Sequence, residues 1–116
     1  MDQRRTLRLA LKRAALSERM VVVFAPQAQR DVQAIYADLV REAGFLVANR
    51  QLARIRQNIE NLSAFPEMGP CRTELGVNRR MLVIRPWVAI YRVGTHEVGV
   101  IRILHGARDL PRVLRP

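Results

Sequence analysis

Two stretches of apolar residues recur at steps of three and four along the chain, and only a short connection at Gly44 separates them. This spacing forms one face of an amphipathic helix, and Pro26, just before the first stretch, is tolerated in a first helical turn. Two such helices joined this closely are expected to form an antiparallel hairpin with a shared apolar face. The first stripe contains Ala28, Val32, Ile35, Tyr36, Leu39 and Val40, and the second contains Leu52, Ile55, Ile59 and Leu62.

Four short β-branched runs flank this hairpin, one before it (21–24) and three after it (79–84, 87–93 and 98–104). Turn residues separate the last three, and the breaker-rich segment 66–78 is expected to be an extended loop. The order strand, helix, helix, strand, strand, strand predicts an α+β fold with the hairpin on one face of a mainly antiparallel sheet and the other face open. Alternation in the last strand places Arg102 on the face opposite Ile101 and Ile103.

The length of 116 residues predicts one domain, which we assign to residues 20–116. Residues 1–19 form a basic extension, either a short amphipathic helix with Leu7, Leu11 and Ala14 on one face or a disordered arm. This extension lacks the apolar core of a secretory signal, and no apolar run is long enough to span a bilayer. We therefore expect a cytoplasmic protein without a membrane partner.

The cysteine content argues against a disulfide or a zinc site. Cys71 is the only cysteine, and no histidine or second cysteine stands at metal-ligand spacing from it. Glycine-rich phosphate loops and nucleophile elbows are also absent from the sequence. We therefore expect no metal and no cofactor.

The formal net charge of +10 is concentrated toward the C-terminus. Residues 71–116 hold nine basic and three acidic side chains, whereas residues 20–70 hold five of each. Nineteen of the twenty basic residues are arginine, whose planar guanidinium pairs with carboxylate or phosphate through two hydrogen bonds. This distribution favours a nucleic acid, the ribosome or an acidic protein as the partner.

Three blocks of the sequence resemble the RelE/ParE superfamily of toxins from type II toxin–antitoxin systems. They are VVVFAPQAQRDVQAIYADL, IRQNIENLSAFPEMGPCRTELG and VAIYRVGTHEVGVIRILHGARDL, which together cover about residues 20–110. The most specific combination is Phe65-Pro66 with Gly69, then Tyr91-Arg92, then the motif from His105 to Asp109. The resemblance implies the strand and helix order above and a growth-arresting toxin that a cognate, ParD-like antitoxin neutralises in a hetero-oligomer.

The superfamily contains two chemistries. RelE-like members cut mRNA on the ribosome, and this reaction needs a phosphate-binding arginine together with a proton donor and acceptor. The resemblance places Arg108 at such an arginine and leaves His105 as a conceivable acid or base. Val88, however, stands where those enzymes have another arginine, and Leu114 where many have a tyrosine. The closing block is closer to ParE-like members, which poison DNA gyrase, so we favour a gyrase poison without catalytic residues over an endoribonuclease.

We predict that the contact with the target is made by Arg92, Arg102, Arg108 and Arg112. We predict that the antitoxin binds the exposed rim of the two helices, where a flexible segment could fold by helix docking and strand addition. A degenerate, non-toxic member kept as a binding module is the remaining alternative. Trp87 and Tyr91 are more often core residues than base-stacking ones, and His105 is more often a hydrogen-bonded strand-end residue than a catalytic one.

Overall fold

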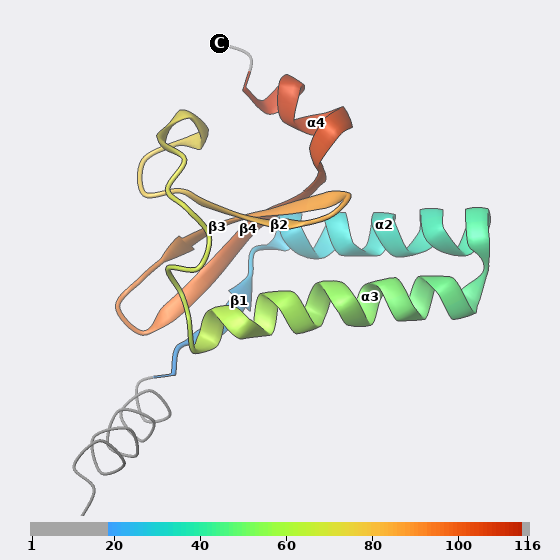
Figure 1. Cartoon of the computed structure of the whole chain (residues 1–116), viewed down its shortest axis with the longest axis horizontal. Helices are drawn as coiled ribbons and strands as arrows, with labels where there is room; N and C mark the ends of the chain where they lie inside the picture. The colour runs from blue at the N-terminus through green and yellow to red at the C-terminus, as the bar shows by residue number, and fades with distance from the viewer. Residues whose placement is uncertain (1–18, 115–116) are drawn as a thin grey trace, which may run out of the picture.

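The computed structural model describes residues 19–114, so the predicted extension over residues 1–19 lies, except for Arg19, outside the described residues. The elements follow the predicted order and add one helix at the C-terminal end (Figure 1). They are β1 (Val21–Phe24), α2 (Pro26–Ala43), α3 (Phe45–Glu60), β2 (Arg80–Ile84), β3 (Trp87–Val93), β4 (Glu97–His105) and α4 (Gly106–Val113). Single 3₁₀ turns stand at Asn61–Ser63 and Thr73–Leu75. Within residues 19–114, no helix is both long and apolar enough to cross a bilayer.

The four strands form one sheet in the order β1-β4-β3-β2. β1 pairs with β4 in parallel, and the other two pairs are antiparallel, which confirms the predicted mainly antiparallel sheet. A bulge interrupts the β3–β4 ladder, because Ile90 pairs with Arg102 and Tyr91 with Val100. Ile101 is therefore an extra residue, and the simple alternation predicted around Arg102 does not hold there.

A single residue, Gly44, joins the two helices of the hairpin. Its N–H donates to Val40 at the end of α2 (2.9 Å), and its carbonyl accepts from Ala48 in the first turn of α3 (3.0 Å). Its φ of 87° lies in the region that glycine adopts most readily. The second helix therefore begins at Phe45, before the first residue of its predicted stripe, Leu52. The hairpin projects well beyond the sheet (Figure 1).

The main core lies between the helical hairpin and one face of the sheet. Ile55 and Ile59 of α3 and Leu62 of the 3₁₀ turn after it meet Tyr91 and Val100 from the two central strands. All five side chains are almost completely buried. Burying apolar side chains of this size stabilises the fold by roughly 1.5–3 kcal/mol each, and this packing fixes the hairpin on the sheet.

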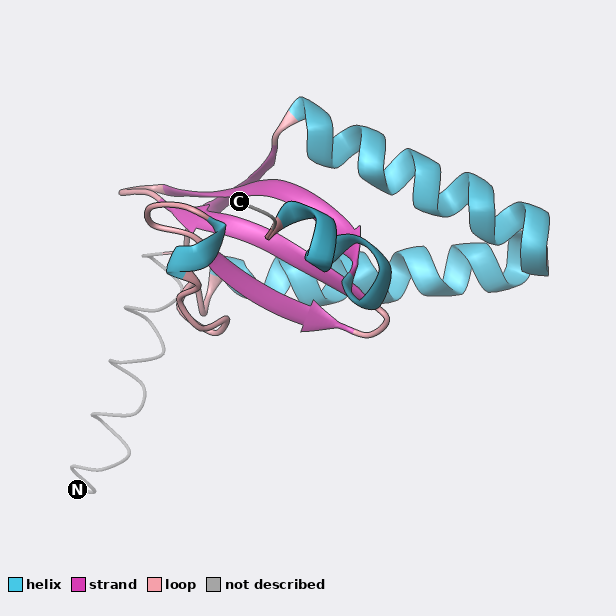
Figure 2. Cartoon of the chain, turned by 90° about the horizontal axis from the view of Figure 1, so that it is seen from above, coloured by secondary structure: helices cyan, strands magenta, loops and turns pink. Residues whose placement is uncertain are grey.

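The opposite face of the sheet is not open, contrary to the prediction. Met81, Val88, Ile90 and Leu104 form a second buried cluster there, and they are covered by Leu75 of the 3₁₀ turn and Leu110 of α4. Figure 2 shows α4 lying across this face. The cover is partial, because Val83 on β2 remains half-exposed. The predicted elements did not include α4, so the helix that covers this apolar face was not predicted either.

Candidate functional site

A cleft of about 290 Å³ lies beside the C-terminal end of β4, between α2 and α4. It brings together three of the four arginines predicted to contact the target, Arg102, Arg108 and Arg112. The α2 wall contributes two carboxylates, Asp31 and Asp38. The cleft is therefore a mixed-charge surface rather than a purely basic one.

Arg102 is held inside this cleft by Asp31. Its Nε donates to Oδ2 of Asp31 at 2.8 Å, and its second terminal nitrogen donates to Oδ1 at 3.1 Å. The backbone N–H of Ile103 donates to the same Oδ2 at 2.9 Å. The hydrogen bonds that Arg102 donates to Asp31 raise the pKa of Arg102 above its ordinary value. Asp31 thus caps the exposed edge of β4 beyond the end of β1, and Arg102 is a poor candidate for a free target contact.

Arg108 and Arg112 are the arginines of the cleft that remain available to a partner. The side chain of Arg108 is 62% exposed and, within residues 19–114, pairs only with its neighbour Asp109, at 3.1 Å. Arg112 is exposed and has no ion pair within residues 19–114. Arg92 lies outside this cleft, where it pairs with Glu97 at 3.2 Å. The four arginines predicted to contact the target therefore do not form one group. Arg108 and Arg112 are available in the cleft, Arg102 is paired there with Asp31, and Arg92 lies elsewhere.

His105 is the N-cap of α4. Its ring Nδ1 accepts from the backbone N–H of Arg108 at 3.2 Å, and its own backbone N–H donates to Oδ2 of Asp109 at 3.0 Å. The two residues satisfy backbone donors reciprocally, as in a capping box. These hydrogen bonds to backbone and to Asp109 are those that the structural interpretation of His105 predicted. The motif from His105 to Asp109 thus has a local physical role, which is to begin α4.

The carboxylate of Asp109 predicts a pH dependence for α4. The hydrogen bond from Arg108 lowers the pKa of Asp109, against the effect of burial, and the backbone N–H of His105 lowers it further. A depressed pKa stabilises the fold above the unfolded value of about 3.9, and this stabilisation is lost as the pH falls through the folded value. We expect Asp109→Asn to lower the free energy of unfolding by less than about 1 kcal/mol at pH 7, since the pair is partly exposed. Denaturant unfolding of both proteins at pH 7 and pH 3 checks this, because the difference should be smaller at pH 3, where the carboxylate begins to take up a proton.

The positions where RelE-like nucleases have further catalytic residues are apolar here. Val88 is 5% exposed within the second cluster, beneath Gly106 at the start of α4. Leu114 caps the end of α4 and is partly exposed. Trp87 and Tyr91 are buried core residues, which confirms the structural interpretation of both. In the described residues no three His, Cys, Asp or Glu side chains gather as metal ligands would.

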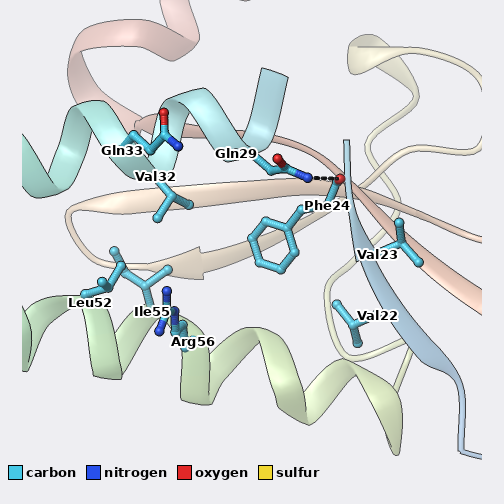
Figure 3. Close-up of a pocket in the computed structure, with 9 residues that line it drawn as sticks. All are labelled: Val22, Val23, Phe24, Gln29, Val32, Gln33, Leu52, Ile55 and Arg56. Atoms are coloured by element: carbon cyan, nitrogen blue, oxygen red, sulfur yellow. Dashed lines mark hydrogen bonds between the residues drawn. The ribbon is translucent and has the colours of Figure 1, made fainter. Parts of the chain in front are cut away.

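A second, larger cavity of about 530 Å³ opens between the two helices and β1 (Figure 3). Phe24, Val32 and Leu52 point into it, and Arg56 is the only charged residue among those that line it. The cavity lies between the facing sides of the helices, not on their exposed rim where the antitoxin site was predicted. The apolar helix residues that line this cavity were predicted from the sequence to be core residues only.

The edge of β1 beside this cavity has few hydrogen-bond partners. Val21 and Ala25 donate toward β4, to His96 (3.1 Å) and Val100 (2.9 Å), so the alternation of a strand directs the N–H groups of Val22 and Phe24 outward. The side chain of Gln29 donates to the Phe24 carbonyl at 3.2 Å (Figure 3). At the other end, Ser63 pairs with Met20. Between these caps, Val22 presents a short edge to which another strand could bind.

Comparison with known proteins places this geometry in context. The profile of the family described as ParE toxin of type II toxin-antitoxin system, parDE, matches residues 22–110. Toxin ParE3 of Caulobacter vibrioides is 35% identical over 80 residues, which is 69% of this chain and 80% of that protein. Toxin RelE2 of the same organism is 32% identical over 87 residues, which is 75% of this chain and 96% of that protein.

Solved structures show the same fold. The chain superposes on a chain of the chromosomal ParDE toxin–antitoxin system from P. aeruginosa with a TM-score of 0.67 and 26% identity, covering 76% of this chain and 97% of that one. A chain of the RelBE2 complex from Mycobacterium tuberculosis gives a TM-score of 0.56 at 22% identity, covering 75% and 91%. The predicted α+β architecture is thereby confirmed.

Proposed function

Because the chain belongs to the ParE toxin family of type II toxin–antitoxin systems, within the RelE/ParE superfamily, we propose that it arrests growth by poisoning DNA gyrase. It acts in the cytoplasm, and a cognate antitoxin neutralises it in a hetero-oligomer. The observation that carries the choice of gyrase over mRNA is the C-terminal cleft. In this cleft Arg108 and Arg112 are available to bind a partner, whereas His105 is the N-cap of α4.

The chemistry of RNA cleavage supports this choice. Cleavage by the 2′-hydroxyl needs a base and an acid within hydrogen-bond reach of the phosphate. Nδ1 of His105 already accepts the Arg108 N–H, so only Nε2 is left for proton transfer. A buried valine and a helix-capping leucine occupy the positions of the other catalytic groups. The resemblance to Toxin RelE2 keeps an mRNA endonuclease as the second candidate.

The antitoxin partner is supported by the apolar cavity between α2, α3 and β1. An apolar groove with one arginine suits an amphipathic segment that carries a carboxylate opposite Arg56. The outward N–H groups of Val22 and Phe24 can hold an extended part of the same segment beside β1. This segment would replace Gln29 at the Phe24 carbonyl. The cavity, rather than the exposed rim, is therefore the antitoxin site that we propose.

The contact that we propose between the cleft and the target can be tested at Arg108 and Arg112. We expect the double variant Arg108→Gln and Arg112→Gln to lose growth arrest, because both residues are exposed, line the cleft and are not part of the buried core. Arg30→Gln on α2 is the control, since Arg30 is also exposed but lies outside the cleft. Colony counts after induction without antitoxin measure the effect. Full arrest by the double variant would contradict the assignment of these arginines, and unimpaired growth with the unmodified chain would support the degenerate, non-toxic alternative.

A further inference from the structure

The five residues after the second helix and its 3₁₀ turn, 64–68, expose an unusual amount of apolar surface for a loop. Phe65 is 65% exposed and Met68 is 45% exposed. Together with Ala64, Pro66 and Glu67 they line an open hollow of about 470 Å³. Loops more often expose polar side chains, and contiguous exposed apolar surface marks sites of interaction.

The backbone of this 64–68 loop is held in place from within the core. The hydroxyl of Tyr91, a side chain with no exposure, donates to the Pro66 carbonyl at 2.8 Å and accepts the Gly69 N–H at 2.9 Å. Burial raises the pKa of this hydroxyl, so it keeps its proton and continues to donate. Arg80 donates to the carbonyls of Glu67 (3.2 Å) and Gly69 (2.7 Å). These contacts make the loop a rigid element.

Gly69 shows how closely the loop is fitted to the sheet. A Cβ atom built on Gly69 would lie 2.6 Å from the Met81 carbonyl oxygen and 2.8 Å from the Tyr91 hydroxyl oxygen. No side chain fits there, so the backbone of the loop can approach the sheet only with glycine at this position. The backbone that carries Phe65 and Met68 is therefore held against the sheet before any partner arrives.

We propose that the 64–68 loop is a preformed apolar anchor that inserts into a cleft on the protein target of the toxin. Exposed phenylalanine and methionine beside arginine are the residue types enriched in protein interfaces. Arg80 at the base of the loop donates to the carbonyls of Glu67 and Gly69, and Arg92 is paired with Glu97, so the loop presents apolar side chains rather than free positive charge. The target is therefore a folded protein with an apolar cleft.

Two features favour this target over other occupants. The carboxylate of Glu67 on the loop would repel the phosphate backbone of a nucleic acid. A rigid anchor gives no advantage to a flexible antitoxin segment that orders on binding, whereas it lowers the entropic cost of docking onto a folded surface. The loop alone is too small for a stable interface of roughly 1,200 Å² or more, so it acts as the anchor of a larger contact.

The test is the double variant Phe65→Ser and Met68→Ser in the full chain, with Val77→Ser as the control. Val77 is 90% exposed on another loop, so its replacement removes apolar surface without touching the anchor. We expect the double variant to require at least ~10-fold more toxin per cell for growth arrest, as loss of anchor residues implies. Its affinity for the antitoxin and its thermal midpoint should match those of the control.

The outcomes distinguish this inference from the proposed function on which it rests. A double variant as toxic as the control overturns the anchor alone, whereas an unmodified chain that leaves growth unimpaired overturns both. Loss of antitoxin affinity in the double variant would assign the loop to the antitoxin instead. Loss of self-association, measured by sedimentation, would assign it to a second copy of the chain. Either reassignment overturns the proposal.

Discussion

Replacing Tyr91 by alanine is expected to lower the free energy of unfolding by about 3–5 kcal/mol, the cost of removing a large buried aromatic side chain. Tyr91 is fully buried between the hairpin and the sheet, so its loss leaves a cavity that rigid neighbours cannot fill. Domains of this size are stable by only about 5–15 kcal/mol in total, so the variant should be close to unfolding at room temperature. Urea denaturation followed by circular dichroism measures the effect.

The variant Tyr91→Phe separates the hydroxyl from the ring. It keeps the packing but leaves the Pro66 carbonyl and the Gly69 N–H without their partner, which should cost about 1–3 kcal/mol. Amide exchange at Gly69 should accelerate, while exchange at Val100 in β4 should change only with global stability. If Tyr91→Phe were as stable as the unmodified chain and Gly69 remained protected, the hydroxyl would not hold the loop as we describe.

Replacing Leu52 by glutamate is expected to weaken antitoxin binding by at least ~100-fold. Leu52 points into the cavity between α2, α3 and β1 (Figure 3), and a new carboxylate there would stand one helical turn before Arg56 and take the guanidinium that we assign to the carboxylate of the partner segment. The carboxylate of the partner segment would then be buried unpaired beside a like charge, which costs several kcal/mol, and each 1.4 kcal/mol is a factor of ten in Kd. Stability should change little, because the free cavity is open to water. Titration calorimetry with the antitoxin measures the change.

The control for this prediction is Leu46→Glu on the same helix. Leu46 is 81% exposed near the tip of the hairpin and does not line the cavity, so the same charge there should leave Kd within about twofold. Equal affinity of the Leu52 and Leu46 variants would show that the antitoxin binds elsewhere, for example on the exposed rim of the helices that the sequence first suggested.

The hairpin and the strands could be predicted because their signals are local and periodic. Stripes such as Ile55, Ile59 and Leu62 report a buried helical face directly, and β-branched runs between turn residues report strands. The helix α4 could not be predicted in this way. It begins with a histidine cap instead of the usual Ser, Thr, Asp or Asn, contains Pro111 and is only eight residues long. Its apolar residues Ala107, Leu110 and Val113 recur at steps of three, but over too few turns to mark a helix beside a proline. The spacing of His105 to Asp109 was a second local signal.

The functional surfaces were harder to predict from the sequence, because they depend on contacts between segments that are far apart along the chain. Asp31 pairs with Arg102, which is 71 positions away, and this pairing removes one arginine from the group predicted to bind the target. The apolar stripes identified helix faces but not the cavity that those faces enclose with Phe24. The motif around Phe65 and Gly69 identified the family, whereas the rigidity of the loop follows from Tyr91 and Arg80 in the sheet.

The most direct measurement of the proposed function uses the purified protein in two reactions, supercoiling by DNA gyrase and translation of mRNA on ribosomes. A gyrase poison should block supercoiling and accumulate cleaved DNA while ribosome-bound mRNA stays intact, and the cognate antitoxin should reverse the block. Cleaved mRNA together with unimpaired supercoiling would contradict the account and identify the chain as an endoribonuclease.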